Sequence, residues 1–170
     1  MIDLLILYEL TKKVFTMYGL SKEIRTRLSS LTLPSIGTIK PALVRLESAG
    51  FIMSQKTFSK GGRPSVYYSI KPEGRTALNS LLKRTLKNNP AQFLTDARIR
   101  LYCADVLDAG EFKEMISALK NQAEYLCNAA TKSAVESDEN FYPKMVFNNL
   151  SCEYKNFISF LEGIERACKR

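Results

Sequence analysis

Two cations flank a pair of glycines in the stretch SKGGRPSVYYSI, residues 59 to 70. Glycine accepts backbone conformations with positive φ, and Pro64 restricts the chain that follows, so the sequence favours a tight turn here. Lys60 and Arg63 would lie at the tip of that turn, where few core side chains could contact them. Exposed cations on a restricted backbone are suited to binding phosphate groups, which is the first chemistry that the sequence suggests.

The positive charge of the chain is concentrated in its first half. Residues 1 to 87 carry 15 lysines and arginines against 5 acidic residues, whereas residues 88 to 170 carry 10 against 12. The two halves therefore have net charges of +10 and −2, in agreement with the +8 of the whole chain. Such asymmetry is typical of proteins that contact nucleic acid, although a solvated basic surface without a partner produces it as well.

Several classes of enzyme need residues that this chain does not have. The sequence contains no histidine, so the commonest general base and the commonest metal ligand are absent. It also contains no glycine-rich loop of Walker or Rossmann spacing, no H-E-x-x-H and no G-x-S-x-G. We therefore expect no catalytic residue, no metal and no cofactor.

The expected location is the cytoplasm, without a membrane partner. No apolar run reaches the roughly 18 residues that a membrane helix needs, and the apolar start MIDLLILYEL lacks the basic residues and cleavage site of a signal peptide. The cysteines are too scattered for a C-x-x-C site: Cys103, Cys127, Cys152 and Cys168. Cytosolic thiols stay reduced, so inert thiols are expected, with thiol sensing as the open alternative.

Three helices are expected before residue 50. The first covers residues 2 to 15, after which Gly19 breaks the run and Ser21 caps a short helix over residues 22 to 28. A third helix follows in SIGTIKPALVRLESAG and ends at Gly50, because glycine accepts the left-handed turn that ends many helices.

The third helix has one apolar face and one face of small, hydroxyl and cationic residues. The apolar positions recur at steps of three and four, at Ile36, Ile39, Leu43 and Leu46. The opposite face presents Gly37, Thr38, Pro41, Val44, Arg45 and Ser48, with Lys40 on the flank. A cap at Thr38 would place Pro41 in the first turn, whereas a cap at Ser35 would place it one turn too deep. Either cap leaves free N–H groups that suit a phosphate.

A β-hairpin is expected next, over residues 51 to 70. FIMSQKTF alternates loosely between apolar and polar residues, and in SVYYSI the residues Val66, Tyr68 and Ile70 alternate with serine and tyrosine. Three helices followed by a hairpin is the element order of a winged helix-turn-helix domain. The hairpin would be the wing, with its basic tip directed at a DNA backbone.

Three segments, YGLSKEI, SIGTIKPALVRLESAGFI and GGRPSVYYSIKPEGR, resemble in order and spacing the signature segments of the PadR family of bacterial transcriptional regulators. The resemblance covers roughly residues 1 to 87. It implies a winged-helix DNA-binding homodimer, usually a repressor, with a helical C-terminal region that dimerises and can sense a small molecule. The family commonly has an aromatic residue at the position of Lys40, so no base-stacking role is carried over to this lysine.

The residues expected to contact double-stranded DNA follow from these elements. Thr38, Pro41, Val44 and Arg45 would approach bases in the major groove, and the fork of Arg45 can grip the O6 and N7 atoms of guanine. Phosphates would mainly be contacted by Ser35, Lys40, Lys56, Lys60 and Arg63. Two recognition helices in one dimer would address half-sites roughly 34 to 36 Å apart.

The second half of the chain is expected to be helical. PEGRTALNSLLKRTLK places four leucines on one stripe, Leu78, Leu81, Leu82 and Leu86. NNP at residues 88 to 90 marks the boundary between a domain of residues 1–87 and a domain of residues 88–170. Helices are then expected near 91 to 107, from a capping box of Asp108 and Glu111 to about 134, and near 143 to 168.

Apolar residues of the last helix recur at alternating steps of four and three. They form a candidate dimer seam: Leu150, Tyr154, Phe157, Leu161, Ile164 and Cys168. Core packing within one chain is the alternative reading of that stripe. An effector pocket at the subunit interface would use Phe93, Tyr102, Met115, Met145, Phe147, Tyr154 and Phe157, again with plain core as the alternative.

The sequence thus predicts a mostly α protein with a small β-hairpin wing, built as a winged helix-turn-helix domain and a helical dimerisation region. The expected function is sequence-specific binding to a DNA operator by a homodimeric regulator, a repressor released by a small apolar or aromatic effector. The alternative is a winged-helix module that binds protein or RNA without an operator. The basic third-helix face and the basic wing argue against this alternative.

Overall fold

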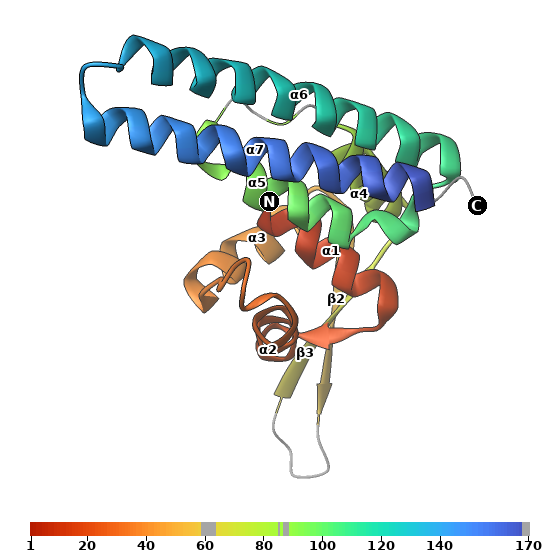
Figure 1. Cartoon of the computed structure of the whole chain (residues 1–170). Coiled ribbons are helices and arrows are strands. Elements are labelled where there is room, and N and C mark those ends of the chain that lie inside the picture. The colour runs from red at the N-terminus through yellow and green to blue at the C-terminus, as the bar shows by residue number, and fades with distance from the viewer. Residues whose placement is uncertain (59–63, 85, 87–88, 168–170) are drawn as a thin grey trace. The chain divides into compact units, whose positions relative to one another are not determined.

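A computed structural model describes the chain except for residues 59–63, 85, 87–88 and 168–170 (Figure 1). It confirms the predicted fold class, a mostly helical protein with a small antiparallel sheet. The chain divides into two compact units, one of Met1–Arg84 with Thr95–Val106 and the other of Thr85–Leu94 with Leu107–Arg170. No helix within the described ranges is long and apolar enough to cross a membrane.

The first two helices begin or end at residues other than those predicted. α1 (Ile2–Lys12) ends before residue 15, because the backbone is extended at Lys13 and Phe15–Thr16 form the short strand β1. α2 (Met17–Leu28) is capped by Thr16, whose Oγ1 accepts a hydrogen bond from the Gly19 N–H at 3.1 Å. Ser21 is therefore not the cap but a buried residue inside α2. Gly19 does not break the helix, since it lies in the first turn.

α3 (Ile36–Ser48) is capped by Ser35, so the preference for a Thr38 cap was wrong. The Ser35 hydroxyl accepts from the Thr38 N–H at 3.2 Å, and Pro41 lies inside the helix. A proline there leaves the carbonyl of Gly37 without its helical donor, but Gly37 is exposed and water can satisfy it. The predicted end of the helix is confirmed, because Gly50 adopts a φ of 75° just after the cap residue Ala49.

The predicted hairpin is present as β2 (Ile52–Phe58) and β3 (Pro64–Ile70), paired antiparallel with Ile52 opposite Ile70 and Phe58 opposite Pro64. The sheet has a third strand that the sequence pattern did not indicate. β1 pairs with the outer edge of β3, with Phe15 opposite Tyr68, and gives the strand order β1-β3-β2. The hairpin tip at 59–63 lies outside the described residues.

α4 (Pro72–Lys83) leaves the hairpin and buries Leu78 and Leu82. Leu86, predicted on the same stripe, lies beyond the end of this helix, which stops at Lys83. Gly74 lies in the first turn of α4, directly against the chain that enters β2. A Cβ atom at Gly74 would lie 2.1 Å from the carbonyl oxygen of Phe51, so the two segments approach more closely than any side chain allows.

α5 (Pro90–Tyr102) is followed by a 3₁₀ turn at Ala104–Val106, and the helix therefore ends earlier than the expected residue 107. The segment Thr95–Val106 groups with the first unit, although the sequence placed it in the second domain. Contacts of Arg100 and Tyr102 connect it to that unit. The Arg100 guanidinium donates to the Leu82 carbonyl at 3.1 Å, and the rings of Tyr8 and Tyr102 meet edge to face at 5.5 Å.

A buried carboxylate lies beside this ring pair. Glu9 is fully buried, and its oxygens accept from the Lys12 ammonium at 3.4 Å and from the Tyr102 hydroxyl at 3.5 Å. The ammonium also lies 4.0 Å from the centre of the Tyr8 ring. Burial, followed by a hydrogen bond with Asp105, raises the pKa of Tyr8. Lys12 and Tyr102 thus compensate the buried Glu9 side chain, as a buried charge requires. The bond from Tyr102 also connects α1 to the segment Thr95–Val106.

The second unit is an antiparallel pair of long helices, α6 (Ala109–Glu136) and α7 (Phe141–Ala167), which lie side by side in Figure 1. The predicted capping box begins α6, with the Glu111 N–H donating to the Asp108 carboxylate at 2.8 Å and the Asp108 N–H donating to Glu111. Lys120 pairs with Glu162 at 2.8 Å, and the hydroxyls of Thr131 and Ser151 lie 2.9 Å apart.

Candidate nucleic-acid interface

α3 presents the predicted outward face. Ile39, Leu43 and Leu46 are buried, whereas the residues proposed to meet DNA are exposed: Thr38, Lys40, Pro41, Val44 and Arg45. Val44 is the apolar member of this face, with 57% of its surface accessible. The face is therefore a shallow surface of small and cationic groups, with which a groove of DNA can make close contact.

The N-terminus of α3 differs in detail from the expectation for Ser35. The hydroxyl of Ser35 accepts from the Thr38 N–H and lies 3.1 Å from the Thr38 hydroxyl, so it is engaged in holding the first turn. The first N–H groups of the helix, at Ile36 and Gly37, have no acceptor within an α-helix by construction. Ser35 therefore holds the first turn in a shape that leaves these backbone N–H groups available as donors.

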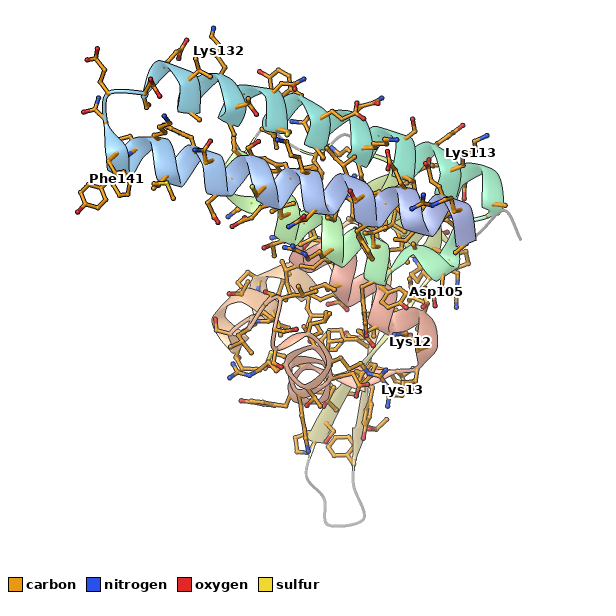
Figure 2. All side chains as sticks on the ribbon, in the orientation of Figure 1. Lys12, Lys13, Asp105, Lys113, Lys132 and Phe141 are labelled. Carbon is orange, nitrogen blue, oxygen red and sulfur yellow. The ribbon has the colours of Figure 1, made fainter. Side chains whose placement is uncertain are left out.

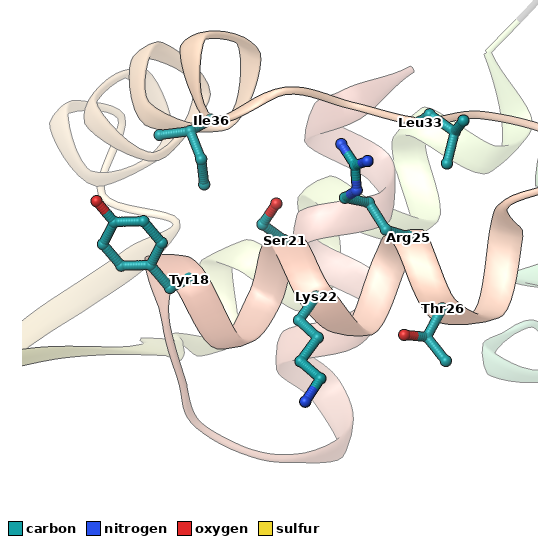
Figure 3. Close-up of a pocket in the computed structure, with 7 residues that line it drawn as sticks. All are labelled: Tyr18, Ser21, Lys22, Arg25, Thr26, Leu33 and Ile36. Carbon is teal, nitrogen blue, oxygen red and sulfur yellow. The ribbon is translucent and has the colours of Figure 1, made fainter.

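A hollow beside this N-terminus brings in residues that the sequence reasoning missed (Figure 3). It has a volume of about 490 Å³ and is lined by Tyr18, Ser21, Lys22, Arg25, Thr26, Leu33 and Ile36. Lys22 and Arg25 project from α2 toward solvent, and Ile36 is the first residue of α3. Two cations, Lys22 and Arg25, and several hydroxyl groups next to a helix N-terminus make an environment that favours a phosphate.

The missed residues share one face of α2. Tyr18, Lys22 and Arg25 follow at steps of four and three, which is helical spacing. Starting this helix at residue 22 hid the pattern, because Tyr18 then lay outside it. The Thr16 cap was the signal that would have revealed the face.

Arg45 is the one predicted base contact with a charged partner inside the described chain. Its Nη2 donates to Asp3 Oδ1 at 2.5 Å, and its Nε donates to Asp3 Oδ2 at 3.2 Å. The hydrogen bond to Asp3, followed by the charge of that carboxylate, raises the pKa of Arg45. For Lys22, Arg25, Lys40 and Lys56, by contrast, no acidic group of the described residues lies within ion-pair distance.

The wing contributes a described cation and two that lie outside the described residues. Lys56 is exposed on β2, opposite Val66 of β3. Lys60 and Arg63 fall in the undescribed tip between the two strands. Phe58 and Pro64 form the last described pair of the hairpin, and both are exposed.

The predicted dimer seam is largely occupied within one chain. Tyr154, Phe157 and Leu161 are at most 4% exposed, and the rings of Tyr154 and Phe157 lie about 6 Å from that of Phe93. Leu150 and Ile164 are half-buried, and Cys168 lies outside the described residues. Tyr154, Phe157 and Leu161 thus lie in the core of one chain, whereas Leu150 and Ile164 keep accessible surface.

Three of the predicted effector residues, Phe93, Tyr154 and Phe157, come together within the second unit, whereas Met115 and Met145 lie apart. Phe93 and Met115 are buried, Tyr102 and Phe147 are half-buried, and Met145 is 52% exposed. Met115 lies near the start of α6 and Met145 near the start of α7. Because the helices are antiparallel, these two methionines lie toward opposite ends of the pair, roughly 25 Å apart along the helix axes at 1.5 Å per residue.

An exposed apolar group at the turn between α6 and α7 was also missed. We call it the hairpin-end patch, and it consists of Val135, Phe141, Tyr142, Met145 and Val146, all more than half exposed. The rings of Phe141 and Tyr142 lie 5.4 Å apart, and Figure 2 shows Phe141 extending from this end of the helix pair. Contiguous exposed aromatic and apolar side chains commonly mark an interaction surface.

Comparison with known proteins identifies a matching family and several relatives. The sequence profile described as "Transcriptional regulator PadR-like family" matches residues 6–80. A PadR family transcription regulator from Clostridium difficile is 34% identical over 46% of this chain and 80% of its own, with a TM-score of 0.42. A transcriptional regulator from Clostridium thermocellum is 30% identical over 46% of this chain and 74% of its own, with a TM-score of 0.43.

A more distant similarity extends over almost the whole chain. Bacillus subtilis PadR, solved in complex with operator DNA, is 19% identical over 95% of this chain and 94% of its own, with a TM-score of 0.46. A search of curated proteins gives no significant match.

Proposed function

Because the chain belongs to the PadR-like family of transcriptional regulators, we propose that it represses transcription by binding a specific operator as a homodimer. DNA binding and transcriptional regulation follow from the family, and the chain is not an enzyme. The proposal adds the mode of recognition, the oligomeric state and the release by an effector.

The exposed face of α3 is the observation that carries the proposal. Thr38, Pro41, Val44 and Arg45 lie together on this face and are exposed among the described residues, and the Asp3 carboxylate lies beside Arg45. A helix with such a face can enter the major groove, where base edges present distinct patterns of donors and acceptors. We assign these four residues to base contacts, and the small side chains allow the backbone to approach the groove.

Phosphate contacts would hold that helix in position. We assign them to Ser35, Lys40, Lys56, Lys60 and Arg63, and we add Lys22 and Arg25 from the hollow beside α3. The addition is supported by the absence of acidic partners for these two cations among the described residues. Phosphate contacts fix register and orientation without reading sequence.

The dimer would form through the helical second unit. Tyr154, Phe157 and Leu161 are already buried within one chain and have little surface left to contact a partner. We therefore propose that the hairpin-end patch and the half-buried Leu150 and Ile164 make the contact. A second copy is the simplest occupant, because in a two-fold dimer each protomer can cover the aromatic side chains of the other. Two copies would also present two α3 helices to a pseudo-palindromic operator.

An effector pocket that used all the predicted residues would require both protomers. Met115 of one chain and Met145 of another could approach each other in an antiparallel dimer, whereas within one chain they lie far apart. We therefore propose that a small apolar or aromatic effector binds only the dimer. A panel of such compounds should raise the melting temperature and release operator DNA; a panel with neither effect contradicts the effector.

The operator and the dimer can be tested together. The protein is incubated with fragmented genomic DNA, and the retained fragments are sequenced and footprinted. We expect a two-fold-related footprint with half-sites roughly 34 to 36 Å apart, and a dimer by light scattering at micromolar concentration. A monomer, a footprint without two-fold symmetry, or equal retention of all fragments would contradict the proposal and favour a protein- or RNA-binding module.

The wing gives a prediction for the double variant Lys60→Ala, Arg63→Ala. Each phosphate that a cation neutralises releases counterions, so the slope of log affinity against log salt should flatten by roughly 0.9 per lost contact. The preference for operator over random DNA should change little.

The matched control is Lys132→Ala, Lys155→Ala, which removes the same charge from exposed positions of α6 and α7. It should leave the salt slope almost unchanged. If the wing variant behaves like this control, the wing does not contact phosphate. If specificity collapses instead, Arg63 reads the minor groove.

A further inference from the structure

A side-chain ion pair connects the recognition helix α3 to α1. Asp3 lies in the first turn of α1 and Arg45 near the end of α3, 42 residues later in the sequence. The guanidinium meets the carboxylate side-on, with Nη2 to Oδ1 at 2.5 Å and Nε to Oδ2 at 3.2 Å. Arg45 has 57% of its side chain exposed and Asp3 30%. Exposed ion pairs contribute little to stability, so a stabilising role alone does not account for this geometry.

The side-on geometry leaves the other edge of the guanidinium unused. An arginine carries five N–H donors in a rigid plane, and Asp3 takes one from Nε and one from Nη2. Both donors of Nη1 and the second donor of Nη2 remain. Two parallel donors on that edge are what a guanine requires at O6 and N7. Arg45 can therefore keep its bond to Asp3 and read a guanine at the same time.

We propose that Asp3 is a positioning residue that determines base specificity by aligning Arg45 for a guanine. This inference rests on the proposed function, because it assumes that α3 reads DNA in the major groove. A free arginine has many rotamers and pays entropy to adopt one of them on binding. Asp3 removes that freedom before DNA arrives, and the planar fork is then presented in one orientation.

The negative charge of Asp3 should also favour specific over non-specific DNA binding. A carboxylate next to the recognition helix repels DNA phosphates, and it is compensated only when Arg45 is held beside it. Arg45 cannot swing to a phosphate without giving up this partner. Binding in which Arg45 merely neutralises backbone charge is thus disfavoured, which raises the ratio of specific to non-specific affinity.

The test compares wild type, Asp3→Asn, Arg45→Ala and the double variant on the operator and on operators with single G·C pairs replaced. In wild type, replacement of the guanine read by Arg45 should weaken binding roughly five- to 150-fold. This penalty should vanish in Arg45→Ala and shrink to a few-fold in Asp3→Asn. The double variant should discriminate no worse than Arg45→Ala, since the two residues act as a unit. Affinity for random DNA should rise in Asp3→Asn.

Two further variants separate positioning from charge and from folding. Asp3→Glu keeps a carboxylate and should recover part of the guanine discrimination lost in Asp3→Asn. If Asp3→Asn melts at a much lower temperature than wild type, Asp3→Glu takes its place in the comparison. Glu162→Gln removes one negative charge and one ion pair from the other unit, and it should leave the base penalty unchanged.

Three results would overturn the proposal. An unchanged guanine penalty in Asp3→Asn would mean that Asp3 does not align Arg45. Its role would then be only the favourable interaction of an acidic residue with the N-terminus of α1. A tighter operator complex with full discrimination would make Asp3 an inhibitory partner that must leave. A wild-type protein that does not distinguish operator from random DNA would instead remove the proposed function itself.

Discussion

A Gly74→Ala variant is expected to lose on the order of 3 kcal/mol of its free energy of unfolding, because the added methyl group has no space. The Cβ atom would lie 2.1 Å from the Phe51 carbonyl oxygen and 2.8 Å from Cγ1 of Ile70. That carbonyl accepts a hydrogen bond from the Lys71 N–H at 2.9 Å, so it cannot move away without breaking the entry to α4. Thermal unfolding followed by circular dichroism should show a melting temperature lowered by roughly 10 °C.

Gly163→Ala is the matched control for this substitution. Gly163 lies inside α7, and a Cβ there meets no atom within 4 Å. Because alanine is the better helix former, the control should gain about 0.5 to 1 kcal/mol. Equal melting temperatures for the two variants would mean that the base of the wing does not approach α4 as closely as described.

The double variant Lys22→Ala, Arg25→Ala is expected to weaken binding to every DNA sequence strongly while leaving the melting temperature nearly unchanged. Both side chains are exposed, and no described acidic group depends on them. If both contact phosphate in each protomer of a dimer, the salt slope should flatten by roughly 0.9 for each of the four contacts. Affinity measured between low and moderate salt would check this, on operator and random DNA in parallel.

A control from the same unit carries the same change in charge. Lys13→Ala, Arg27→Ala removes two cations that already lie beside Glu23, at 4.0 Å and 2.5 Å. Because that carboxylate compensates much of their charge, this control should change the salt slope less. A larger effect of the control than of Lys22→Ala, Arg25→Ala would move the phosphate site away from the hollow beside α3.

Features that depend on a few neighbouring residues could be predicted from the sequence. The buried and exposed faces of α3 follow from the spacing of Ile39, Leu43 and Leu46. The capping box of Asp108 and Glu111 and the left-handed turn at Gly50 depend on groups within four residues of each other. The candidate interface could be predicted in part for the same reason, since most of its proposed residues lie on one helix and one hairpin, but its residues on α2 were missed.

Local rules failed where two of them competed. The proline rule favoured a cap at Thr38, but the Ser35 cap prevailed because its hydrogen bond is made and the lost donor of Pro41 costs little at an exposed carbonyl. The periodicity of α7 showed that a stripe is buried without showing what covers it. Phe93 and α6 cover Tyr154 and Phe157 within one chain, so the predicted dimer residues are mostly core.

Contacts between residues far apart in the sequence were decided only by the tertiary structure. The sequence by itself determined the family, the helix-turn-helix order and the basic face, because periodicity, caps and turn residues act over a few positions. It could not show that Asp3 meets Arg45, that Phe15 pairs with Tyr68, or that Gly74 touches Phe51. Each of these contacts depends on how whole helices and strands pack, since a contact across dozens of residues forms only when the burial of many side chains offsets the entropy of closing the chain between them.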